Sequence, residues 1–223
     1  MTHGPADDVP CRQKMQRMKR HLDVLVVESD LGAADDAAAA LEAVGHHVHR
    51  CYEVADPGLT CRAVRDPGAC PLDSGIDVAL LVRGTTDPLP TGREIGVSCA
   101  VRAHVPVAAQ GPALDAYEPF LTRRIDGDVA DEVVVAADLG DKALREDILD
   151  RVRMVLPCAS VDTVDCELER VGHRLVVHLL GPRIGNRAEK AAAVRVLDAV
   201  WASGRTYGHV DVSYHARSDV TSP

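Results

Sequence analysis

Short apolar runs alternate with longer amphipathic stretches over the first two thirds of the chain. Short continuous apolar runs are typical of strands that are buried on both faces of a sheet. We predict five strands of this kind, at residues 23–27, 46–52, 76–82, 105–109 and 132–136. The amphipathic stretches between and after them predict helices at 32–44, 59–65, 93–103, 115–124 and 142–156.

The alternation of strands and helices indicates a fold class. Right-handed crossovers between successive strands favour one parallel sheet with helices on both faces. We therefore predict an α/β fold over residues 21–156, with a doubly wound five-stranded parallel sheet. Residues 1–20 carry basic side chains but no apolar segment of the kind found in a secretory signal, so we interpret them as a flexible leader.

The pattern changes after Pro157. The segments beyond it predict two strands at 161–169 and 174–180, a helix at 187–202 and a strand at 210–214. This order predicts a small ββαβ (α+β) module over residues 159–216, followed by a tail at 217–223. A module of this size buries little apolar surface by itself, so we expect it to pack on the first domain or on another copy.

Composition and charge narrow the classes of partner. The 223 residues carry a formal charge of −9 and are 3% aromatic, which disfavours contacts with phosphate backbones and stacked bases. No apolar run approaches the roughly 18 residues that span a bilayer. The seven cysteines contain no C-x-x-C pair and are typical of reduced thiols in the cytoplasm. We expect a cytoplasmic protein that binds neither nucleic acid nor a membrane.

Three segments occur in an order that is known from one protein family. They are Val24-Leu25-Val26-Val27-Glu28-Ser29-Asp30, the strand Asp77–Leu81, and Val105-Pro106-Val107. With them, residues 21–156 resemble a bacterial response-regulator receiver, a CheY-like or flavodoxin-like domain. The resemblance implies four functional parts: an acidic pair that holds Mg²⁺, an acceptor Asp after the third strand, a Ser or Thr after the fourth, and a Lys after the fifth.

Most of these parts are missing at the matching positions. Val82 stands where the acceptor Asp is expected and cannot accept a phosphoryl group, and Arg83 places a positive charge beside it. Ala136 stands where the Lys is expected. The degenerate receiver site that we predict consists of Glu28, Ser29, Asp30, Val82, Arg83 and Gln110.

Two other kinds of site remain open. Arg83, Arg93 and Arg102 are candidates for a small-anion or nucleotide site at the carboxyl ends of the strands, where doubly wound folds bind ligands, and surface salt bridges are the alternative. A second candidate is a zinc or iron–sulfur site. Its candidate ligands are Cys51, Cys61, His47 and His49. The alternative is that the two cysteines are buried core thiols and that the two histidines lie on an exposed strand face.

These observations favour a non-enzymatic protein without a cofactor. We expect a regulatory or scaffolding protein in signal transduction, built on a pseudo-receiver that binds other proteins and forms a homodimer with the help of its C-terminal module. The identity of the protein partner is open. The alternatives are a Cys/His-based metal or redox sensor and a small-anion or nucleotide-binding protein.

Overall fold

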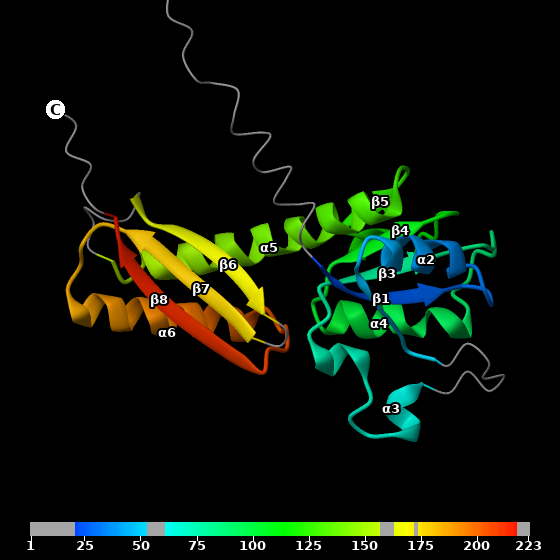
Figure 1. The fold of residues 1–223 in the computed structure, drawn as a ribbon, viewed down its shortest axis with the longest axis horizontal. Helices are drawn as coiled ribbons and strands as arrows, with labels where there is room; N and C mark the ends of the chain where they lie inside the picture. The colour runs from blue at the N-terminus through cyan, green and yellow to red at the C-terminus, as the bar shows by residue number, and fades with distance from the viewer. Residues whose placement is uncertain (1–20, 53–60, 157–162, 172–173, 218–223) are drawn as a thin grey trace, which may run out of the picture.

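The computed structural model describes residues 21–52, 61–156, 163–171 and 174–217, and it contains two sheets that the long helix α5 connects (Figure 1). The first sheet is parallel, in the order β2-β1-β3-β4-β5. Its strands are β1 (Asp23–Glu28), β2 (His47–Arg50), β3 (Val78–Val82), β4 (Val107–Gln110) and β5 (Arg123–Ile125). The predicted leader and all of the predicted tail except residue 217 lie outside the described residues.

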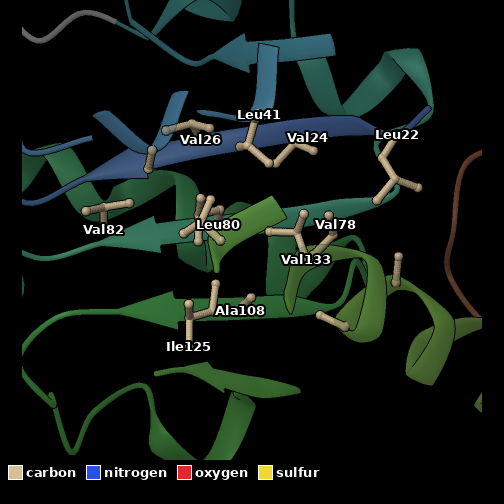
Figure 2. Close-up of a cluster of buried hydrophobic side chains, with 14 of the residues drawn as sticks. Leu22, Val24, Val26, Leu41, Val78, Leu80, Val82, Ala108, Ile125 and Val133 are labelled. Atoms are coloured by element: carbon tan, nitrogen blue, oxygen red, sulfur yellow. The ribbon is translucent and has the colours of Figure 1, made fainter. Parts of the chain in front are cut away.

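Helices cover both faces of this sheet. Successive side chains of a strand point to opposite faces, so a strand can contribute to two cores. Val24 and Val26 of β1 belong to a core with α2 (Asp35–Ala43) and the first half of α5 (Val129–Arg153), which Figure 2 shows. Leu25 of β1 belongs to a second core with α4 (Ile95–Arg102). The predicted α/β fold is therefore confirmed. The short elements are α3 (Arg62–Arg65) and the 3-10 turns η1 (Pro71–Ser74), η2 (Gly92–Glu94) and η3 (Glu118–Phe120).

The prediction of the fifth strand at 132–136 is wrong, and so is the helix at 115–124. Residues 132–136 lie inside α5, whose first turn is capped by the Asp128 carboxylate, which accepts hydrogen bonds from the backbone N–H groups of Ala130 (2.9 Å) and Asp131 (3.1 Å). The fifth strand is Arg123–Ile125. It is short and contains two arginines, so it has no apolar run by which the sequence could reveal it.

The second sheet is small and mixed. It consists of β6 (Asp165–Val171), β7 (Arg174–Gly181) and β8 (His209–Ala216), with β6 antiparallel and β8 parallel to the central β7. One face packs on α6 (Asn186–Ala202) and on the second half of α5, in a core that includes Ile148, Val177 and Val196. The predicted order of strand, strand, helix and strand is therefore present.

Helix α5 contributes to both parts of the molecule. Val133 packs in the core of the first sheet, whereas Ile148 and Leu156, which lies just beyond the helix, pack in the core of the second. Residues 144–156, which we assigned to the first domain, therefore contact the C-terminal elements as well. The domain boundaries at 156 and 159 stay a prediction. Over the described residues, no helix is both long and apolar enough to cross a bilayer.

A buried histidine follows α2 and makes the stability of the fold depend on pH. The backbone N–H of Leu22 donates a hydrogen bond to Nδ1 of His46 over 3.1 Å, so Nδ1 must be unprotonated. Burial is the main cause that lowers the pKa of His46 from its ordinary value of 6.5, and the nearby His21 adds to this effect. The native state therefore favours the neutral ring.

The replacement His46→Gln should reduce the loss of stability in mild acid. The unfolded chain binds a proton at His46 at a higher pH than the native protein does, so the contribution of the neutral ring is complete above pH about 6.5 and is lost as pH falls through the lowered native pKa. Gln keeps an acceptor for Leu22 but does not titrate. Urea unfolding at several pH values should give a shallower slope for His46→Gln in this window, and parallel profiles would contradict the prediction.

Candidate functional site

The predicted degenerate site lies where three neighbouring strands end. Glu28 ends β1, Val82 ends β3 and Gln110 ends β4, and the strand register pairs Glu28 with Val82 and Val82 with Gln110. The loops continue this pairing, since the backbone N–H of Arg83 donates to the carbonyl of Gln110 over 2.9 Å. The structure therefore brings these residues to one edge of the sheet, as the parallel order requires.

Both carboxylate oxygens of Glu28 already accept hydrogen bonds. Oε1 lies 3.1 Å from Nη1 of Arg93, and Oε2 lies 3.5 Å from Nη1 of Arg50 and 3.1 Å from the backbone N–H of Gly32. The Glu28 side chain is only 9% exposed. A cavity of about 10 Å³ adjoins these side chains, which is room for about one water molecule. The Glu28 carboxylate is thus paired with two arginines.

Ser29 connects the loops that follow β1 and β3. Its hydroxyl donates to Oδ2 of the exposed Asp30 over 2.7 Å and accepts from the backbone N–H of Gly84 over 2.9 Å. Its carbonyl accepts a hydrogen bond from the Thr91 hydroxyl, also over 2.9 Å. Ser29 therefore holds backbone segments together, and its side chain is buried.

Arg83 forms a buried ion pair with Glu94 in η2. Nε of Arg83 lies 2.6 Å from Oε1 of Glu94, and the two side chains are 1% and 0% exposed. The other guanidinium nitrogens donate to the backbone carbonyls of Ala113 (3.3 Å) and Asp87 (2.9 Å). Oε2 of Glu94 accepts from the backbone N–H of Thr91 over 2.6 Å. All three nitrogens of the Arg83 guanidinium therefore have partners inside the protein.

Sequence reasoning did not identify Glu94 or Arg50 as parts of this site. A signal for Glu94 was present, since Thr91-Gly92-Arg93-Glu94 has the spacing of a capping box, which the structure contains. That signal predicts the start of a helix and does not indicate the contact with Arg83. Arg50 ends β2, and only the pairing of β2 with β1 brings it to Glu28.

The prediction for the residue after the fifth strand must also be corrected. Because β5 ends at Ile125, the residue that follows it is Asp126, and Ala136 lies within α5. The position still contains no lysine. A hollow of about 430 Å³ lies nearby, lined by Val82, Arg83 and Gln110 among others.

The three arginines of the candidate anion site do not converge. Arg83 is buried against Glu94, Arg93 faces Glu28, and Nη2 of Arg102 lies 3.5 Å from Sγ of Cys99. Each of the three lines a different hollow. The structure therefore does not form one anion site from Arg83, Arg93 and Arg102.

The candidate metal ligands are likewise placed in other contacts. His47 Nδ1 and His49 Nε2 approach the same carboxylate oxygen of Asp23, at 3.5 and 2.7 Å. Burial, with smaller effects from neighbouring thiols that include Cys61, raises the pKa of Cys51 to about 12, so its thiol is protonated at neutral pH. Within the part of the chain that the structure describes, no three His, Cys, Asp or Glu side chains are arranged to hold a metal ion.

Comparisons with known proteins do not assign a family. No protein-family model matches the chain, and no curated protein matches it. Among solved structures, a crystal structure of Era in complex with MgGDPNP and nucleotides 1506–1542 of 16S ribosomal RNA is similar with a TM-score of 0.31 and 12% sequence identity, covering 88% of this chain and 95% of that chain. A similarity of this extent carries no functional argument.

Proposed function

We propose that this chain is a non-enzymatic regulatory or scaffolding protein, built on a receiver-like domain that is not phosphorylated and that acts through protein contacts in the cytoplasm. The strand order β2-β1-β3-β4-β5 supports a doubly wound, receiver-like arrangement, because this is the order of flavodoxin-like folds. The observation that carries the proposal is the state of Glu28, which is bound by Arg50 and Arg93 at the edge where the receiver family holds its metal.

The surroundings of Glu28 oppose the binding of Mg²⁺. Mg²⁺ requires oxygen ligands at about 2.0–2.1 Å in a nearly ideal octahedron. At Glu28, a cation would have to displace two guanidinium groups, in a space of about 10 Å³. Phosphotransfer also needs an acceptor, and Val82 offers only a buried aliphatic side chain at the matching position. Both requirements of the reaction are unmet at the same edge of the sheet.

Two exposed apolar surfaces favour protein contacts. A groove of about 810 Å³ along α4 and η3 includes Ile95, which is 56% exposed, and Phe120, which is 52% exposed. On α6, Val194 and Trp201 are 56% and 72% exposed and stand seven residues apart, which places them on one helix face. The position of Trp201 and Val194 supports self-association as a homodimer through the C-terminal module.

Treatment with acetyl phosphate and Mg²⁺ should leave the protein unmodified. Intact-mass spectrometry is the measurement, with an authentic receiver domain as the positive control. The variant Val82→Asp supplies an acceptor carboxylate, and it should remain unmodified as well because Arg50 and Arg93 still occupy Glu28. An aspartyl phosphate on the wild-type chain, for example at the exposed Asp30, would overturn the proposal.

A further inference from the structure

The second sheet has one face without a covering helix in the described structure. Leu175, Val177 and Leu179 of β7 point into the core with α5 and α6, so His178 points to the opposite face. The register pairs His178 with Ser213 of β8, and His215 follows two residues later on the same face. His178 is therefore directly opposite Ser213 and diagonal to His215 (β7 and β8 in Figure 1).

Three polar atoms converge on this face. Nδ1 of His178 lies 2.7 Å from Oγ of Ser213 and 3.2 Å from Nε2 of His215, and Oγ of Ser213 lies 2.9 Å from that same Nε2. The two imidazole rings are tilted by 41°, with centroids 5.4 Å apart. Two ring nitrogens that face each other can share at most one proton, so this arrangement suits a bridging cation.

We propose that His178 and His215 bind a divalent transition metal ion, with the Ser213 hydroxyl beside them as a hydrogen-bond partner. The geometry supports this assignment. Zinc–imidazole bonds of about 2.0–2.1 Å at a tetrahedral angle place two ligand nitrogens roughly 3.3 Å apart. The observed separation of 3.2 Å needs almost no adjustment to reach that value. Imidazole nitrogen suits Zn²⁺, Ni²⁺ and Cu²⁺.

Neighbouring acids support the binding of a cation. Oε2 of Glu169 on β6 lies 3.6 Å from Nε2 of His178, on the side of the ring away from His215. This carboxylate adds negative charge beside the ring, on the side opposite the proposed metal position. Glu167 is the register partner of His178 on β6, so it adds negative charge to the same face. The remaining coordination positions are open to water or to a ligand from a partner.

The other histidine contacts in the described structure differ from this one and provide controls. His209 Nε2 lies 3.0 Å from Oδ1 of Asp211 on the same sheet face, so it faces a carboxylate oxygen. His47 and His49 face Asp23 in the same way. None of these imidazoles is directed at a second ring nitrogen. The proposed site is thus separate from the Cys/His candidates of the first domain.

Calorimetric titration of the full-length, untagged chain with Ni²⁺ or Zn²⁺ tests the proposal. We expect one saturable site, and we expect His178→Gln and His215→Gln each to weaken it by roughly 10- to 100-fold or more. His209→Gln, on the same face, should leave the affinity unchanged. Saturable binding that both His178→Gln and His215→Gln retain, or the absence of saturable binding to the wild type, would overturn the proposal.

A second measurement does not depend on how well the variants fold. Electron paramagnetic resonance of the Cu²⁺-loaded wild-type chain should show nitrogen coupling from two imidazoles, and a spectrum with one imidazole or none would also overturn the proposal. Circular dichroism of the variants verifies that their folds are intact. The acetyl phosphate experiment addresses the first domain separately, so failure of the metal site would leave that proposal in place.

Discussion

Replacing Glu94 by Gln should lower the free energy of unfolding by about 3–5 kcal/mol. The substitution keeps the shape of the side chain but removes the charge that neutralises Arg83. The guanidinium is 1% exposed, so it cannot recover its hydration without a rearrangement of the loop after β3. Urea denaturation, followed by circular dichroism, measures the effect. A loss of this size would show that the buried Arg83 guanidinium depends on the charge of Glu94.

Two variants give this measurement its controls. Glu146→Gln breaks an exposed pair with Lys142, in which the charged atoms are 3.8 Å apart and the side chains are 64% and 66% exposed, and it should change stability by less than about 0.5 kcal/mol. The double replacement of Arg83 by Met and Glu94 by Leu should recover part of the loss, because it leaves no unpaired charge. If Glu94→Gln cost no more than Glu146→Gln, the buried pair would not stabilise the fold.

The pair of Arg83 and Glu94 explains how this edge of the sheet tolerates a cation beside Val82. The sequence alone predicts a positive charge where the receiver family binds a metal and a phosphoryl group, and it leaves open which acid compensates for that charge. The structure places this acid in η2, eleven residues further along the chain. Glu28, a second acid at this edge, is occupied by Arg50 and Arg93. The charges of Arg83 and Glu28 are thus compensated by other side chains of the protein.

The sequence predicts the strands that are apolar and fails where a strand is polar. β1 and β3 are buried apolar runs, and their positions follow directly from the hydrophobic pattern. β5 has two arginines in three residues, so the mostly apolar stretch at 132–136 is the stronger signal in the sequence and predicts a strand there. In the structure this stretch lies within α5, because Asp128 caps a helix just before it.

The candidate site was predictable only in part, for a related reason. Residues at the ends of parallel strands must meet at one edge, so the proximity of Glu28, Val82 and Gln110 follows from the strand assignment. The partners of these residues depend on side-chain directions and on loop paths. The convergence of His178 and His215 likewise requires the register between β7 and β8, which is not visible in the sequence. The pairing of strands therefore determines which polar residues meet.

Replacing Arg170 by Met should also destabilise the protein by about 3–5 kcal/mol, because this residue joins the two sheets. From β6, its guanidinium donates to Asp77, just before β3, and to Asp141 on α5, whose side chains are 9% and 6% exposed. Burial acts to lower the pKa of Arg170, but the charges of Asp141 and Asp77, with Tyr207, raise it overall. Arg174→Met is the control, since its pair with Asp211 is exposed to solvent and its loss should change stability far less.

The shape of the urea transition of Arg170→Met decides how the two sheets depend on each other. After the replacement, Asp77 still accepts a hydrogen bond from the backbone N–H of Asp23 over 2.9 Å, and Asp141 still pairs with Arg205 over 3.2 Å. Both carboxylates, however, lose the Arg170 guanidinium that they share. Because α5 contributes to both cores, we expect a single transition at lower urea. Two separate transitions would show that Arg170 is what couples the sheets, and a loss no larger than that of Arg174→Met would contradict its role.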